Sequence, residues 1–156
     1  MDLSLYIPES DFDIHNWPLL GFGVAFIIPS LQTLTLKDVD VDDYDLETFS
    51  HLRRKTDLKE LSILCARMSI KSFARMLSFP RALRFLELLE IQPYDDRRTK
   101  GAWTSKNQYL SILQQRASLE EMIVNDMFQP VYIDTSHFPR LRDCTGCYDK
   151  SSGELI

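Results

Sequence analysis

The 156-residue sequence predicts an α/β fold in which short parallel strands form one wall and helices form the other. The first observation behind this prediction is a recurring spacing of leucines by three and then two residues. That spacing fits neither the 3.6-residue period of a helix nor the strict alternation of a strand for its whole length. The second is that segments with helical spacing lie between successive copies of the pattern. Repeats of this kind indicate a short solenoid, here of about four to five irregular repeats.

Five copies of the spacing place an apolar or small residue at positions one, four and six, and the clearest is LQTLTL, which begins at Leu31. We expect one domain over residues 1–156, with repeats at 31–57, 58–82, 83–118 and 119–140. A degraded C-terminal repeat occupies 141–156, where LRDCTG supplies Leu141, Cys144 and Gly146. Residues 1–30 are expected to be an atypical N-terminal cap or a partial repeat, since Leu3 and Leu5 echo the core pattern.

The spacing assigns a side to each strand residue. Positions one, four and six point into the core, so positions three, five and seven line the other face of the sheet. That face would then carry an apolar strip and one carboxylate, which we predict to bind a partner: Leu64, Phe85, Glu87, Leu89 and Ile123. Two alternatives remain at this level. Residues 1–30 could cover the sheet, or a one-residue slip of register could exchange the two faces.

Helices are predicted on the return segments. Residues 69–79 have helical spacing with Ser69 as N-cap, and residues 105–117 have a stripe of Leu110, Leu113 and Ala117 after a serine. A weaker helix is predicted over 45–54, capped by Asp45. The segment before the fifth copy, FQPVYIDTSHFPRL, is expected to be extended or irregular because it holds two prolines and no helical stripe.

Composition is that of an ordinary globular protein, with 44% hydrophobic and 26% charged residues. The longest apolar run, residues 17–28, is too short and too interrupted to span a membrane. The three cysteines and the absence of an Asn-x-Ser/Thr site favour a reduced, intracellular protein, cytoplasmic or nuclear.

Charge is unevenly distributed along the chain. Residues 1–50 hold ten acidic residues against Lys37 alone, whereas residues 51–106 hold thirteen basic residues against six acidic ones. The basic segment includes RRTKGAWTSK, in an insertion that makes its repeat longer than its neighbours. An acidic chain of pI 5.2 argues against nucleic acid as the partner. Arg97, Arg98 and Trp103 instead have the composition of a protein-interface anchor, although a solvated loop has the same charge mix.

Chemical motifs are few. Cys144 and Cys147 form CTGC, and His137 lies upstream, but a structural zinc site needs four ligands and a redox pair should open a helix. The acidic run from Asp38 to Glu47 fails the calcium-loop pattern, which requires a glycine and a glutamate where this sequence has Asp43 and Phe49. Nucleophile, phosphate-loop and metalloprotease motifs are absent, so we expect no catalysis and no cofactor.

The stretches IIPSLQTLTL, MLSFPRALRFLEL and RASLEEMIV resemble the irregular leucine-rich-repeat regions of fungal F-box proteins, over about residues 27–145. An F-box is not recognisable in residues 1–30. The resemblance implies a protein–protein interaction module, such as the substrate-recognition part of an F-box-type ubiquitin ligase subunit or a truncated relative. The alternatives are a small metal- or redox-active protein that uses CTGC, or a decayed fragment without a partner.

Overall fold

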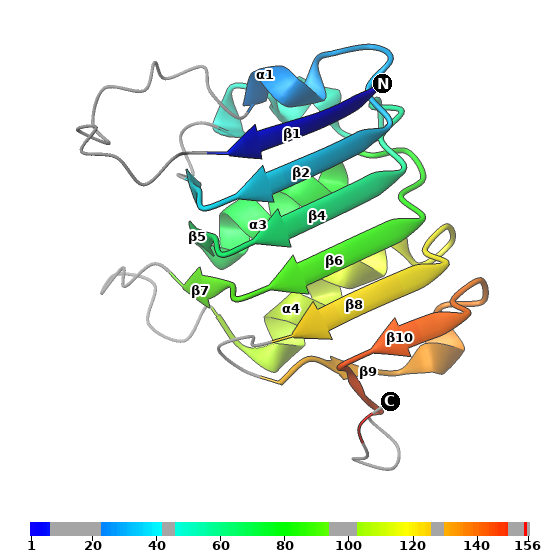
Figure 1. Ribbon diagram of the computed structural model, residues 1–156. Coiled ribbons are helices and arrows are strands. Elements are labelled where there is room, and N and C mark those ends of the chain that lie inside the picture. The colour runs from blue at the N-terminus through cyan, green and yellow to red at the C-terminus, as the bar shows by residue number, and fades with distance from the viewer. Residues whose placement is uncertain (7–22, 42–45, 94–102, 126–129, 150–154, 156) are drawn as a thin grey trace.

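A computed structural model describes residues 1–6, 23–41, 46–93, 103–125, 130–149 and 155. Six strands form one parallel sheet in which spatial order follows chain order (Figure 1). They are β1 (Asp2–Tyr6), β2 (Thr33–Lys37), β4 (Glu60–Leu64), β6 (Phe85–Leu89), β8 (Glu121–Asn125) and β10 (Asp143–Thr145). The α/β class and the parallel sheet predicted from the leucine spacing are therefore confirmed.

The register of this sheet aligns equivalent positions of the repeats. Leu34 pairs with Leu61, Leu61 with Leu86, and Leu86 with Met122. These four side chains are completely buried. The second inward row, two residues further along each strand, is at most 3% exposed and consists of Leu36, Ile63, Leu88 and Val124. The predicted inward positions are thus correct. Leu3 extends the first row to β1, where it pairs with Leu34, and Cys144 extends it to β10, where it pairs with Met122.

The chain bends sharply after each of three main strands. Asp38, Cys65 and Glu90 follow β2, β4 and β6 directly and have φ angles of 53°, 51° and 53°. This left-handed conformation disfavours residues other than glycine, so each turn stores a small strain. The turn directs the next residue into the core, where Val39, Ala66 and Ile91 are 1–2% exposed.

Two narrower sheets lie beside the main one, and the strands of the first follow these bends directly. The strands β3 (Asp40–Val41), β5 (Arg67–Met68) and β7 (Gln92–Pro93) pair in parallel. The strands β9 (Tyr132–Ile133) and β11 (Tyr148–Asp149) form a second pair, and β9 lies within the predicted extended segment.

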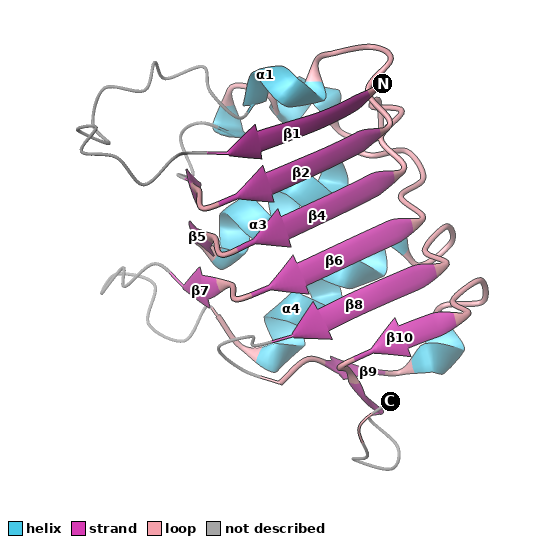
Figure 2. Ribbon diagram, viewed as in Figure 1, coloured by secondary structure: helices cyan, strands magenta, loops and turns pink. Residues whose placement is uncertain are grey.

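Helices lie behind the main sheet, on the side of the buried leucines (Figure 2). They are α1 (Gly23–Phe26), α3 (Ile70–Ser78) and α4 (Ser105–Ile112), with 3₁₀ turns η2 (Ser50–Leu52), η4 (Leu113–Gln115) and η5 (Thr135–His137). Ser69 caps α3 as predicted, because its hydroxyl accepts a hydrogen bond from the Ser72 amide. None of the helices in the described ranges is long and apolar enough to cross a membrane.

The other two helix predictions need correction. Thr104, not Ser105, caps α4, and the helix buries Gln108, Ser111 and Ile112 while Leu110 is 50% exposed and Ala117 is exposed. The predicted stripe is therefore only partly inward: Leu113 packs against the core, whereas Leu110 and Ala117 do not. The segment 45–54 becomes a helical turn at residues 46–47 followed by η2, and Asp45 lies outside the described residues.

Gln115 is a polar residue whose side chain points into the core at the end of this helical segment, because it forms hydrogen bonds with backbone groups there. Its side chain is 2% exposed, and its Nε2 donates to the carbonyl oxygens of Leu77 (2.6 Å) and Pro80 (3.0 Å). Its Oε1 accepts a hydrogen bond from the Leu83 amide at 3.0 Å. One side chain thereby satisfies three backbone groups where the chain passes from α3 to β6.

We predict that Gln115→Ala lowers the free energy of unfolding by about 3 kcal/mol, because it leaves several buried backbone groups without partners. Gln114→Ala is the matched control, since Gln114 is half-buried and donates one hydrogen bond, to the Ala74 carbonyl oxygen. That control should cost about 1 kcal/mol or less in urea-induced unfolding followed by circular dichroism. Equal losses for the two variants would contradict the role given to Gln115.

Candidate partner-binding surface

The sheet face that points away from the helices carries positions three, five and seven of the repeats (Figure 2). We call this surface the outer face. Register-paired residues of parallel strands lie on the same side of a sheet, so rows of side chains cross all six strands. The first row is Asp2, Thr33, Glu60, Phe85, Glu121 and Asp143, and the second is Ser4, Thr35, Ser62, Glu87, Ile123 and Thr145.

The predicted apolar strip lies on this outer face. Leu64, Phe85, Leu89 and Ile123 are all partly exposed, in contrast to the fully buried leucines between them along the strands. Leu64 and Leu89 are direct cross-strand partners, and Phe85 lies at the start of the strand that Leu89 ends. The predicted register is therefore correct, and the strip is a surface feature of the described molecule.

Polar side chains lie beside and between the apolar residues of the strip, and some of them contact one another. The Thr33 hydroxyl donates to Glu60 Oε2 at 3.2 Å, and the Ser62 hydroxyl donates to Glu87 Oε2 at 2.7 Å. Glu87 also pairs in register with Ile123. Within the described part of the chain, the carboxylates of Glu60 and Glu87 are thus oriented by neighbouring hydroxyls and not by ion pairs.

The structure corrects one of the three residues predicted to form a partner anchor in the insertion loop. Arg97 and Arg98 lie outside the described residues, whereas Trp103 is only 8% exposed and belongs to the core. Its ring packs against Phe73 of α3, with centroids 5.8 Å apart. Trp103 directly precedes the cap of α4, and its contact with Phe73 holds α4 against α3 instead of leaving the ring exposed to a partner.

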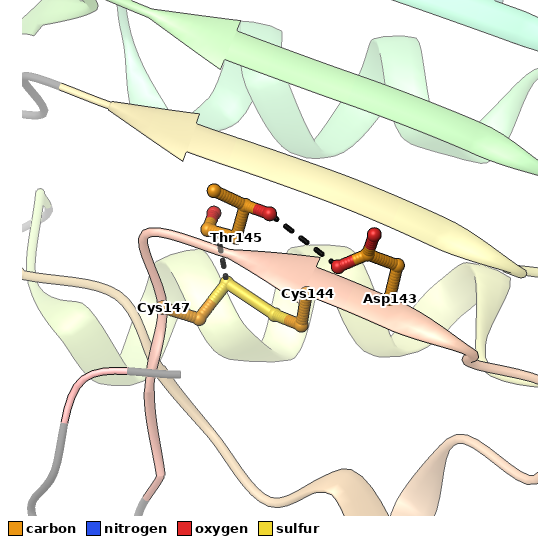
Figure 3. Close-up of a disulfide and its surroundings, with 4 residues drawn as sticks. All are labelled: Asp143, Cys144, Thr145 and Cys147. Carbon is orange, nitrogen blue, oxygen red and sulfur yellow. Dashed lines mark hydrogen bonds between the residues drawn. A yellow bond between two sulfur atoms is a disulfide. The ribbon is translucent and has the colours of Figure 1, made fainter.

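Cys144 and Cys147 form a disulfide across the turn after β10 (Figure 3). Their Cα atoms are 6.2 Å apart, and the two residues are 7% and 0% exposed. The expectation that all the cysteines are reduced is therefore wrong for this pair, and only Cys65 is free. The pair follows a strand and does not open a helix, and burial shields it from thiol exchange.

Gly146 makes this closed turn possible. Its φ angle is 77°, and a methyl group there would overlap the carbonyl oxygen of Val124 on the adjacent strand β8. The sequence pattern placed Gly146 on the inward sixth position of a strand. Instead, β10 ends at Thr145, and the glycine allows the backbone to approach β8 closely before turning.

His137 does not join the cysteines. It lies in η5, where its Nδ1 contacts the Tyr109 hydroxyl and its Nε2 is 3.9 Å from Asp134 Oδ2. Burial, followed by the charge of Asp134, raises the pKa of Tyr109 above its usual value. Within the described ranges, no group of three or more His, Cys, Asp or Glu residues is arranged to hold a metal ion.

A hollow that the sequence did not predict lies beside the turns that follow β2, β4 and β6. It has a volume of about 370 Å³ and is lined in part by Asp38, Asp40, Cys65, Arg67 and Glu90. Arg67 Nη2 lies 2.9 Å from Asp40 Oδ2, and the Cys65 thiol donates to Glu90 Oε2 at 3.1 Å. The only sequence signal was that Asp38, Cys65 and Glu90 occupy the same eighth position of successive repeats.

Comparison with known proteins gave no relative on which to base a family assignment. No family model, no curated protein and no solved structure matches this chain.

The hollow yields a prediction about thiol reactivity. The hydrogen bond to the Glu90 carboxylate, then burial and the charges of Glu90 and Asp38, raise the pKa of Cys65 to about 11. Because the thiolate is the reactive form, Cys65 should react slowly with iodoacetamide at pH 8 and faster as the pH approaches 11. Glu90→Gln removes the negative charge, lowers the pKa of Cys65 and should raise the rate at pH 8 about tenfold.

Glu121→Gln is the control for this experiment because it removes an equal charge from the outer face. Its rate should match that of the unchanged protein. If Glu90→Gln left the rate at pH 8 unchanged, the contact between Cys65 and Glu90 would not control the thiol.

Proposed function

We propose that this chain is a non-enzymatic protein–protein interaction module, built as a short leucine-rich-repeat solenoid, and that its outer face binds another protein. The observation that carries the proposal is the apolar strip of Leu64, Phe85, Leu89 and Ile123 on a sheet face that points away from the helices. Contiguous apolar side chains outside the core often mark partner sites.

The composition of the strip suits an interface centre. Phe85 offers a rigid aromatic side chain, and three aliphatic residues lie on its own and the two adjacent strands. Glu60 and Glu121 flank Phe85 in its row, and Glu87 lies between Phe85 and Leu89 on the same strand. Interfaces commonly combine a buried aromatic or aliphatic anchor with a polar rim that excludes water.

The solenoid interpretation rests on repetition. Four repeats share the same inward triplet and main strand, the bend is described in three of them, and their leucines are buried by the neighbouring repeats. The resemblance to the repeat regions of fungal F-box proteins then suggests a class of partner. The chain would be the substrate-recognition part of a ubiquitin ligase subunit, or a truncated relative, and the partner would be a protein selected for ubiquitination.

Site-specific photocrosslinking tests the proposal. We expect p-benzoylphenylalanine in place of Phe85 to yield a discrete crosslinked partner in cells that express the protein. The same group in place of Leu110, which is 50% exposed on α4, should not capture that partner. Excess unlabelled protein should abolish the crosslink, whereas excess Phe85→Glu protein should not.

The competitor variant is informative only if it is folded. Phe85 is partly exposed, so Phe85→Glu should melt within a few degrees of the unchanged protein. Equal crosslinking at positions 85 and 110, or equal competition by Phe85→Glu, would contradict the proposal and favour a decayed fragment without a partner.

A further inference from the structure

The outer face is strongly acidic. Its described residues include five carboxylates and one amine: Asp2, Glu60, Glu87, Glu121 and Asp143 against Lys37. All but Glu87 are exposed. Within the part of the chain that the structure describes, none of these five carboxylates takes part in an ion pair.

The carboxylates are ordered relative to the apolar strip. In the first row, Glu60 and Glu121 flank Phe85 directly on the two adjacent strands. Neighbouring strands lie about 4.8 Å apart, so these two carboxylates are separated by about 10 Å with the aromatic ring between them. Along the same row, Asp2 and Asp143 place further negative charge at the two edges of the sheet.

The opposite wall has the reverse charge. Arg53, Lys71 and Arg75 line a shallow hollow beside α3, together with Ala74 and Gln114. Arg75 also lies 3.8 Å from Glu47. Among the described residues, the hollow beside α3 is therefore basic and the outer face acidic, and a charge difference of this kind guides a cationic ligand to the acidic side.

We propose that the outer face binds a cationic segment of a second protein, in which Lys or Arg residues lie on both sides of an apolar side chain. This inference rests on the proposed function. The apolar residue packs on Phe85 and its aliphatic neighbours. The flanking cations pair with Glu60 and Glu121, which lie on either side of Phe85 on the two adjacent strands. The three contacts together fix the position of the segment across the strands.

A random dodecapeptide library displayed on phage tests this inference. The full chain is immobilised for selection, and the Phe85→Glu variant is used to remove peptides that bind elsewhere. We expect the surviving sequences to be enriched in Lys or Arg with Leu, Phe or Trp between them. Binding of a selected peptide should weaken as salt is raised from low to physiological ionic strength.

Matched charge reversals then locate the contact. Glu121→Lys should weaken the selected peptide about tenfold in fluorescence anisotropy, because an attractive charge pair becomes repulsive. Glu47→Lys changes the net charge equally, but Glu47 lies beside Arg75 of α3 on the opposite wall, so this variant should bind as the unchanged protein does. Thermal melting of both variants confirms that they are folded.

The remaining outcomes separate this inference from the function on which it rests. Acidic or uncharged apolar peptides that lose binding in Phe85→Glu would overturn the cationic partner and leave the outer face as the binding site. If no selected peptide depended on Phe85 for binding, the result would overturn both the cationic partner and the outer face as the binding site. If sedimentation showed that the chain self-associates and Glu121→Lys prevented it, the occupant would be the basic wall of a second copy, which also overturns the proposal.

Discussion

The burial of each repeat's leucines by the neighbouring repeats is the interaction on which the rest of this structure depends. A single strand with inward residues at two positions cannot enclose them, so Leu61 and Ile63 require Leu34 and Leu36 on one side and Leu86 and Leu88 on the other. Each fully buried leucine contributes about 2 kcal/mol of transfer free energy. Register follows from this requirement, since a slip by one residue would place the carboxylate of Glu60 or Glu87 in the core.

The other features solve problems that the rows of leucines create. A chain that must leave the sheet and return needs a bend after each strand, and the left-handed residues Asp38, Cys65 and Glu90 supply it. The passage from α3 to β6 leaves backbone groups to be satisfied where no strand or helix continues, and Gln115 satisfies three of them from inside the core. Every second side chain of a strand lies on the face that does not pack against the helices. The acidic and apolar residues that we assign to partner binding lie on that outer face.

The sequence predicted the part of the structure that short-range periodicity determines. Alternation along LQTLTL and LRFLEL identified both faces of the sheet, because side-chain direction in a strand depends only on parity. The face of α4 could not be obtained in this way: Gln108 and Gln115 are buried by tertiary contacts, and a polar residue gives no apolar signal. Trp103 was misassigned for the converse reason, because its position beside Phe73 depends on how α4 packs on α3. The sequence identified CTGC as a motif but not its disulfide. The bond and its burial depend on the turn at Gly146, which the spacing of the cysteines does not predict.

The central claim is that adjacent residues of one strand face opposite ways, one into the shared core and one onto the outer face. Thiol labelling of single cysteines tests it most directly, in a Cys65→Ser background that leaves only the Cys144–Cys147 disulfide. Phe85→Cys should react with a maleimide in the native protein, because Phe85 is partly exposed. Leu86→Cys, at a fully buried position, should react only as fast as the protein unfolds. Fast labelling of Leu86→Cys together with protection of Phe85→Cys would contradict the assignment of the two faces.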